Sequence, residues 1–290
     1  MTTETMLVVM AHPDDETFGL GGTLALYAKR GVKVHLICAT RGEAGTVDPE
    51  FMEGYSSVAD LRVNELLCAA EQLGLEEVHF LDYRDSGMVG TKDNEHPGAL
   101  AQAPVDEVVA TLVGHIRRLR PQVVLTFDPM GGYGHPDHIA IHKATVRAYE
   151  AAADPQLFSD AGSPFQPQKL YFMTFSLRFV KPTLALLRLF GRDPRKWGRN
   201  EDIDLTEVFE TRFPVNAKVN YRKVADQRRR AMACHASQLG MGRSTRGLVG
   251  ALFRLNRSGT VETFMRADPP VTNGRIERDL FEGVHLEAVA

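Results

Sequence analysis

The stretch VVMAHPDDETFGLGG, residues 8–22, indicates both a fold and a chemistry. Its apolar beginning is typical of a buried strand, and it breaks off into an imidazole and three carboxylates between His12 and Glu16. Imidazole nitrogens and carboxylate oxygens are ligands that zinc accepts. The stretch therefore predicts a buried strand that ends at a metal or catalytic site.

The composition is that of an ordinary globular chain. Of its 290 residues 43% are hydrophobic and 24% are charged, enough to bury a full core. The 34 basic and 37 acidic residues leave a formal charge of −3, which gives no electrostatic reason to expect nucleic acid or an anionic membrane as a partner. A small or neutral substrate fits this balance better.

The N-terminal region predicts a cytoplasmic protein without stable membrane insertion. It lacks the basic segment of a secretory signal, and the apolar stretch 6–11 is far shorter than a membrane span. The three cysteines, Cys38, Cys68 and Cys234, have neither zinc-knuckle nor disulfide-framework spacing, so we expect buried free thiols.

Four strand-then-helix units follow one another in the first half of the chain, which predicts a mostly parallel α/β sheet with helices on both faces. The predicted strands are 6–10, 32–39, 78–81 and 122–127, and the predicted helices are 23–30, 57–73, 105–119 and one from about residue 136. In the second half we expect strands at 169–175, 208–213 and 261–265, a long helix at 217–237, and a lid or interface helix, less often a membrane-surface helix, within 178–199.

A polar segment follows each of the first four predicted strands, at residues 12–16, 40–43, 85–87 and 128–138. Ligands bind at the carboxyl ends of strands in such sheets, so these segments are expected to meet. His12, His138 and either Asp14 or Asp15 supply the three protein ligands of a catalytic zinc, and the other aspartate would face the bound water as a base.

The fourth polar segment divides its histidines between roles. Pro136 is suited to the first helical turn, which places His138 toward the sheet edge as a ligand and His135 just outside, as a hydrogen-bond donor to an oxyanion. His142 lies one turn further and is expected to support the site or belong to the core.

Three other interpretations stay open from the residues alone. Both histidine segments could be helix-capping turns, and the site could bind a metal without catalysis. Glycines 19, 21 and 22 could form the loop of a dinucleotide-dependent oxidoreductase, although the last glycine of that motif is missing and nearby carboxylates would repel a pyrophosphate.

At these motifs the sequence resembles the LmbE-like family, also called the N-acetylglucosaminyl-phosphatidylinositol de-N-acetylase (PIG-L) family. The matching segments run in family order across nearly the whole chain: AHPDDE (11–16), TRGE (40–43), LRVNEL (61–66), DSGM (85–88), GGYGHPDH (131–138) and HASQ (235–238). The resemblance implies one Rossmann-like, LmbE-like domain over 1–290, with a core at 1–155 and a smaller C-terminal α+β part at 156–290 that shapes the pocket mouth.

The resemblance also implies roles for single residues. A zinc ion is held by His12, Asp15 and His138, and Asp14 is the general base. His135, oriented by Asp137, stabilises the oxyanion and can protonate the leaving amine, and Tyr133 helps to polarise the carbonyl. Arg62 and Asp85 bind the sugar hydroxyls, and His235 lies near the pocket mouth.

The implied activity is removal of the N-acetyl group from a GlcNAc-type small molecule, giving acetate and a free amine. The alternative within the family is an amidase of thiol conjugates, which carries a lysine where this chain has Gly19. Relatives often form homo-oligomers, whose size the sequence does not give.

Overall fold

The computed structural model has one seven-stranded sheet, in the strand order β3-β2-β1-β4-β5-β7-β6. It describes residues 3–174, 184, 187–189, 191, 193–196, 204–206, 213–239, 259–272 and 274–286. The strands are β1 (Thr5–Met10), β2 (Lys33–Thr40), β3 (Glu77–Tyr83), β4 (Val123–Thr126), β5 (Lys169–Thr174), β6 (Ala217–Asn220) and β7 (Val261–Asp268). Because β7, β6 and β5 extend the sheet of the first half, both halves of the chain share one sheet.

The five strands from β3 to β5 are parallel, and β7 is antiparallel to both its neighbours. The central strand β1 is buried along its whole length, as its apolar sequence predicts. The strand order reverses between β1 and β4, so the loops that leave these two strands diverge and open a crevice at the carboxyl edge. This confirms the predicted mostly parallel α/β fold.

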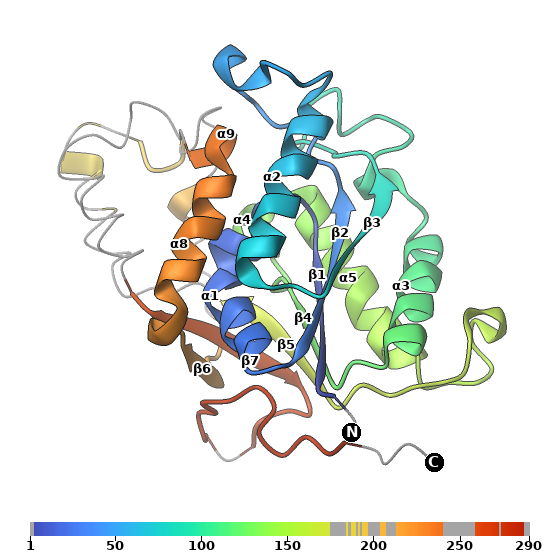
Figure 1. Ribbon diagram of the computed structural model, residues 1–290. Coiled ribbons are helices and arrows are strands. Elements are labelled where there is room, and N and C mark those ends of the chain that lie inside the picture. The colour runs from blue at the N-terminus through green and yellow to red at the C-terminus, as the bar shows by residue number, and fades with distance from the viewer. Residues whose placement is uncertain are drawn as a thin grey trace.

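Helices cover both faces of the sheet (Figure 1). On one face α1 (Asp15–Lys29), α2 (Val58–Leu73) and α8 (Ala225–Cys234) pack together, and on the other α3 (Val105–Leu119) packs against α5 (Pro136–Ala151). Short helices α4 (Gly131–Gly134) and α9 (Ala236–Leu239) precede α5 and follow α8. The helix α2 begins as its sequence predicts, since the Ser57 side chain accepts a hydrogen bond from the Asp60 backbone N–H.

The first helix begins eight residues before the predicted start, at Asp15 instead of residue 23. Glycines 19, 21 and 22 therefore lie inside a helix and not in a turn at its N-terminus, so the dinucleotide-loop interpretation is wrong. Gly22 serves packing instead, because a Cβ atom there would lie 2.1 Å from the ring of Tyr221. The close contact between α1 and Tyr221 thus explains why position 22 is a glycine.

The predicted long helix at 217–237 is also wrong. Its first residues form β6, which pairs with β7, and helix α8 begins only at Ala225. Pairing with a strand more than forty residues away overrides the local helical pattern. The predicted strand at 208–213 lies almost wholly outside the described residues, as does most of the segment 178–199.

Two of the three cysteines differ from the expectation of free thiols. Cys68 on α2 and Cys234 at the end of α8 form a disulfide, with Cα atoms 5.7 Å apart, whereas Cys38 is a buried free thiol. The partners are separated by 166 residues, so the pairing becomes visible only once α2 and α8 pack side by side.

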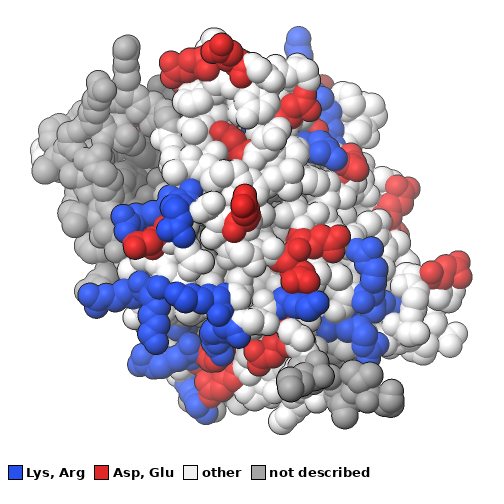
Figure 2. Space-filling model, viewed as in Figure 1, with Lys and Arg blue, Asp and Glu red and all other residues white. Residues whose placement is uncertain are grey.

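Charged side chains are distributed unevenly over the face seen in Figure 2. Exposed acidic residues gather at the upper end, where the 3-10 turn Pro49–Met52 carries Glu50 and is followed by Glu53. Exposed basic residues gather around the lower part of α8, among them Lys223 and Arg230. Within the described ranges, no helix is long and apolar enough to cross a membrane.

Candidate metal centre and active site

Two histidines from distant loops meet at the carboxyl edge of the sheet. His12 follows β1, His138 lies in the first turn of α5, and His12 Nδ1 lies 3.1 Å from His138 Nε2. The second nitrogen of each ring faces an acceptor: His12 Nε2 lies 3.1 Å from an Asp137 carboxylate oxygen, and His138 Nδ1 lies 3.0 Å from the Gly131 carbonyl. These acceptors hold the ring protons on His12 Nε2 and His138 Nδ1. The lone pairs of His12 Nδ1 and His138 Nε2 therefore point toward one another.

Asp15 supplies the third donor, next to these two nitrogens. Its carboxylate oxygens lie 3.5 Å from His12 Nδ1 and 3.4 Å from His138 Nε2. Adjacent ligand atoms of a tetrahedral zinc ion are about 3.3 Å apart when each bond is about 2.0–2.1 Å long. The three donors therefore have the spacing that a single metal ion requires, and they are the three residues that the family resemblance implies as ligands.

The surroundings of His12 favour a positive charge. Burial opposes charging of its ring, but the Asp85 carboxylate and the hydrogen bonds to Asp137 and Asp15 outweigh this and hold the pKa of His12 well above its usual value. Carboxylates that favour a proton on a buried imidazole equally favour a metal cation in its place. The cluster can thus hold a metal ion.

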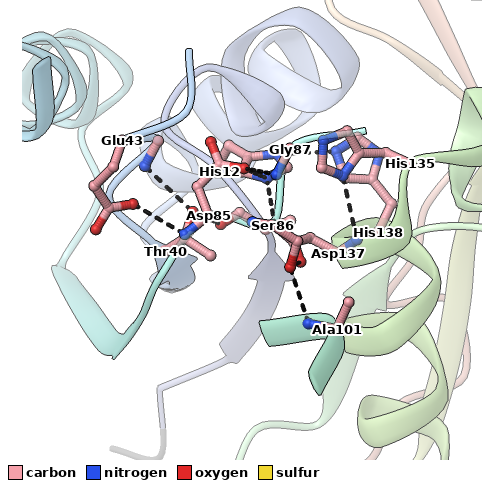
Figure 3. A network of polar contacts seen from close by, with 12 residues as sticks. His12, Thr40, Glu43, Asp85, Ser86, Gly87, Ala101, His135, Asp137 and His138 are labelled. Atoms are coloured by element: carbon pink, nitrogen blue, oxygen red, sulfur yellow. Dashed lines mark hydrogen bonds and ion pairs between the residues drawn. The ribbon is translucent and has the colours of Figure 1, made fainter. Parts of the chain in front are cut away.

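Asp137 is fixed by the loop after β3 (Figure 3). The Ser86 backbone N–H donates to the Asp137 carboxylate over 2.9 Å, and the Ser86 hydroxyl donates to the other carboxylate oxygen. That hydroxyl in turn accepts a hydrogen bond from the Ala101 N–H over 3.0 Å. The chain Ala101–Ser86–Asp137–His12 therefore orients one proposed metal ligand through three elements of the fold.

His135 is the N-cap residue of α5 and lies beside both proposed histidine ligands. Its ring centroid is 4.5 Å from that of His12 and 5.0 Å from that of His138. His135 Nδ1 accepts a hydrogen bond from the Asp137 backbone N–H, so the ring proton resides on Nε2. Burial and the neighbouring histidines lower the pKa of His135 to about 2. With its proton on Nε2, His135 is a neutral hydrogen-bond donor in this arrangement, and one of its nitrogens also lies within 4.8 Å of ligand atoms of His12 and His138.

The contact between Asp137 and His135 differs from the one expected. Asp137 holds His135 through its backbone N–H, whereas its carboxylate is turned toward His12 and Ser86. The Asp137 carboxylate thus supports His12, which lies 125 residues earlier in the chain, and not its near neighbour His135. This partner was not evident from local spacing.

Asp14 has a backbone conformation that is rare outside glycine, with φ of 112°. Its N–H donates to the Glu16 carboxylate over 2.9 Å, and its own carboxylate accepts from Arg62 over 3.0 Å. Burial raises the pKa of the Asp14 carboxyl to about 6, against the opposing effect of Arg62. A carboxylate with such a pKa can accept and release a proton near neutrality.

The turn between β4 and α5 carries Tyr133. Its ring lies 5.9 Å from the ring of His135 and 5.1 Å from that of His138, centroid to centroid, and burial raises the pKa of its hydroxyl, which stays protonated. The Asp128 carboxylate shapes the turn by accepting from the Met130 and Gly132 N–H groups. Gly131 is required because its φ is +63° and a Cβ atom would lie 2.7 Å from His138 Cβ.

Glu16 and His235 form a fully buried pair beneath Asp14. His235 Nε2 lies 2.7 Å from a Glu16 carboxylate oxygen, and both side chains have 0% exposure. The other oxygen of Glu16 accepts the Asp14 N–H. His235 was expected at the pocket mouth as a substrate contact, but its burial assigns it to holding Glu16, and through it the backbone of Asp14.

We expect His235→Gln to lower kcat by about 10–100-fold and to change KM little, because a small displacement of a reacting group lowers rate more than binding. The glutamine amide can still reach Glu16 but lacks the rigid ring. Steady-state kinetics would measure both constants, with the exposed His285→Gln as a control. A raised KM at unchanged kcat would instead mean that His235 contacts the substrate.

The remaining predicted residues also lie at this edge of the sheet. Arg62 is buried and directed at Asp14, and Asp85 lies with one oxygen 3.5 Å from His12 Nε2, so their proposed contacts with sugar hydroxyls stay predictions. His142 packs against Phe172 and its Nδ1 lies 2.8 Å from the Phe127 carbonyl, in agreement with a core position. Sequence analysis missed Ser86, although it lies in the DSGM motif.

Comparisons with known proteins agree with this geometry. The family model described as PIG-L, GlcNAc-PI de-N-acetylase, matches residues 7–149, which include most of these side chains. The chain is 37% identical to a 1D-myo-inositol 2-acetamido-2-deoxy-α-D-glucopyranoside deacetylase of Rhodococcus erythropolis, over 97% of each chain.

Solved structures with the same fold belong to proteins that are named for different reactions. N,N′-diacetylchitobiose deacetylase from Pyrococcus horikoshii has a TM-score of 0.61 at 18% identity, covering 97% of this chain and 86% of its own. The 4-carboxy-2-hydroxymuconate hydratase GalB from Pseudomonas putida KT2440 also reaches 0.61, at 21% identity, covering 93% of this chain and 99% of its own. The fold is therefore shared, and the reaction must be inferred from the site.

Proposed function

The chain belongs to the PIG-L family of GlcNAc-PI de-N-acetylases, and from its site we propose that it is a zinc-dependent deacetylase of a small GlcNAc-type glycoside. The candidate substrate is 1D-myo-inositol 2-acetamido-2-deoxy-α-D-glucopyranoside, which the Rhodococcus relative is named for. The named activity of that relative also favours deacetylation over hydrolysis of a thiol conjugate.

The observation that carries this proposal is the close approach of two imidazole nitrogens and one carboxylate. His12 Nδ1 and His138 Nε2 lie 3.1 Å apart, and each lies 3.4–3.5 Å from an oxygen of Asp15. Two histidines and an aspartate form a donor set suited to zinc, and three protein ligands leave one position for water. A bound zinc ion would supply a Lewis acid that activates water and polarises the acetamide carbonyl.

Asp14 acts first as the general base and then as the general acid of the proposed reaction. Its carboxylate accepts a proton from the attacking water as the new C–O bond forms. When the C–N bond breaks, the same carboxyl returns the proton to the departing amine, so the products are acetate and a free amino sugar. Arg62 holds the carboxylate in place throughout, and the pKa of about 6 suits both transfers.

His135 acts on the oxygen that becomes negative in the transition state. With Nδ1 occupied by a backbone N–H, Nε2 donates a hydrogen bond to that oxygen without needing a charge on the ring. The protonated hydroxyl of Tyr133 is a second donor on the same side. This division assigns proton transfer to Asp14 and oxyanion stabilisation to His135.

The charge near the site favours a neutral substrate over an anionic one. The 3-10 turn Pro49–Met52, in the loop that leaves the carboxyl end of β2, carries exposed Glu50 and is followed by exposed Glu53. Acidic side chains gather at this end of the molecule (Figure 2). Negative charge at this end disfavours a phosphate relative to an uncharged inositol, to an extent that falls as ionic strength rises. We therefore favour the free inositol glycoside over its phosphatidyl form.

Product analysis tests the proposed substrate. Acetate and free amine would be measured from the inositol glycoside, from N-acetylglucosamine, from N,N′-diacetylchitobiose and from N-acetylglucosaminyl-phosphatidylinositol. We expect the inositol glycoside to have a kcat/KM about tenfold higher or more, because hydroxyl-specific hydrogen bonds discriminate strongly. A preference for the phosphatidyl form would contradict the charge argument, and no acetate from any of them would contradict the proposed reaction.

Replacing His135 by alanine should lower kcat by about 10²–10³-fold with the metal retained, since one oxyanion donor is lost. Metal content and kcat would be measured on the same sample. His135→Asn is the matched variant, because asparagine preserves an N-cap acceptor for α5 but places no donor at the imidazole position. Activity restored by asparagine would show that the capping contact, and not oxyanion stabilisation, explains the loss.

A further inference from the structure

A second cluster of histidines lies near the opposite end of the sheet. His35 on β2 and the pair Glu77 and His79 on β3 bring one nitrogen or oxygen each to within 4.8 Å of one another. In the parallel register His35 lies opposite Glu77, so the three side chains share one face. His35 lies five residues before the end of β2, about 16 Å along the strand from the catalytic edge.

Each of the two imidazoles has one ring nitrogen that lacks a hydrogen-bond partner and lies in this cluster. His35 Nδ1 and His79 Nε2 are buried and make no hydrogen bond with any described residue. Their side chains are only 9% exposed each, so water reaches them poorly. The same two atoms lie 3.8 Å and 3.4 Å from one Glu77 carboxylate oxygen. A buried polar atom without a partner is costly, and two that face a common carboxylate point to a missing ligand.

We propose that His35, Glu77 and His79 bind a second divalent metal ion of the zinc class, separate from the catalytic centre. Two imidazoles and a carboxylate form a donor set that zinc accepts, and a water would complete the coordination. The Glu77 side chain is 58% exposed, so an ion can enter from solvent and the carboxylate is free to adjust its position.

The surrounding charges support neutral, ligand-ready imidazoles. Burial is the main cause that lowers the pKa of His35, and the neighbouring His79 adds to it. Burial also lowers the pKa of His79, against the opposing effect of the Glu77 carboxylate. The ring of His115 on α3 lies 5.0 Å from that of His79, centroid to centroid, at an angle of 56°, and its Nδ1 lies 3.0 Å from an Arg118 nitrogen. His115 lines the cluster but is not one of its three donors. Arg118 is exposed, and solvent screens its repulsion of a cation.

The consequence concerns the edge of the sheet. β3 is the outermost strand on this side, and the ion would join it to β2 through side chains as well as backbone hydrogen bonds. An ion that binds the folded chain preferentially stabilises it by mass action. The site is therefore assigned a structural role.

The test removes the catalytic centre first. In the His12→Ala/His138→Ala background, equilibrium dialysis against zinc followed by elemental analysis should give about one ion per chain, with a rise in the melting temperature on zinc addition. Adding Glu77→Gln and His79→Gln to this background should abolish both. The matched control is Glu76→Gln with His96→Gln, because both residues are exposed and neither belongs to the cluster.

Three results are informative. Binding that is lost with Glu77→Gln/His79→Gln and kept in the control supports the site. No stoichiometric zinc in the His12→Ala/His138→Ala background, with folding verified by circular dichroism, would overturn it. So would binding that persists after Glu77→Gln/His79→Gln, because the ion would then lie elsewhere. The single variant Glu77→Gln, at an exposed position, separates loss of a ligand from loss of folding.

Discussion

Asp14→Asn is expected to lower kcat by about 10²–10⁴-fold, the range that a positioned acid–base group contributes, while the metal content stays unchanged. Asparagine is nearly isosteric with aspartate and tolerates the left-handed backbone conformation that position 14 requires. It can still accept the hydrogen bond from Arg62, but it cannot take a proton from water. The reaction therefore loses its base and keeps its geometry.

The control for this variant is Asp82→Asn. Asp82 also has a positive φ, of 60°, but it is exposed, pairs with Arg41 and is not one of the proposed site residues. We expect unchanged kinetics there. Elemental analysis would compare the metal content of the two variants and the parent protein, and timed assays of acetate release would compare their kcat. If Asp14→Asn kept full activity, the assignment of the base would be wrong.

His138→Ala is expected to remove the catalytic metal and with it all measurable deacetylation. The ring supplies one of the three donors of the proposed ligand set, and a catalytic zinc site is built on three protein ligands. The proposed second site would keep its own ion, so the measured quantity is the loss of one ion per chain relative to the parent protein.

His142→Asn is the matched control, because His142 lies one turn along the same helix and its Nδ1 faces a backbone carbonyl instead of the cluster. Asparagine can preserve that contact. Metal content and activity should stay near those of the parent protein. An unchanged metal content in His138→Ala would contradict the proposed ligand set.

Local sequence patterns predicted six of the seven strands of the sheet and missed β6. The helix Val105–Leu119 begins and ends where the pattern places it, because its apolar positions recur at helical spacing. The start of the first helix was missed because Pro13 and three glycines resemble a loop, whereas the glycines are selected by close packing against residues such as Tyr221.

The residues of the candidate site could be predicted from the sequence, but most of the contacts between them could not. The polar segments had to meet because parallel strands share a carboxyl edge, and His12, Asp15 and His138 do converge. The pairs Glu16–His235 and Asp137–His12 join residues 219 and 125 positions apart, and no local spacing encodes them. The disulfide between Cys68 and Cys234 was missed for the same reason.

The central claim is that one metal ion is held between the loop after β1 and the first turn of α5. The most direct test is an anomalous-difference map at the zinc absorption edge from crystals of the full chain. The account predicts a peak about 2.0–2.1 Å from His12 Nδ1, His138 Nε2 and an Asp15 carboxylate oxygen. A peak bonded to His135 instead of Asp15, or no peak at this edge of the sheet, would contradict it.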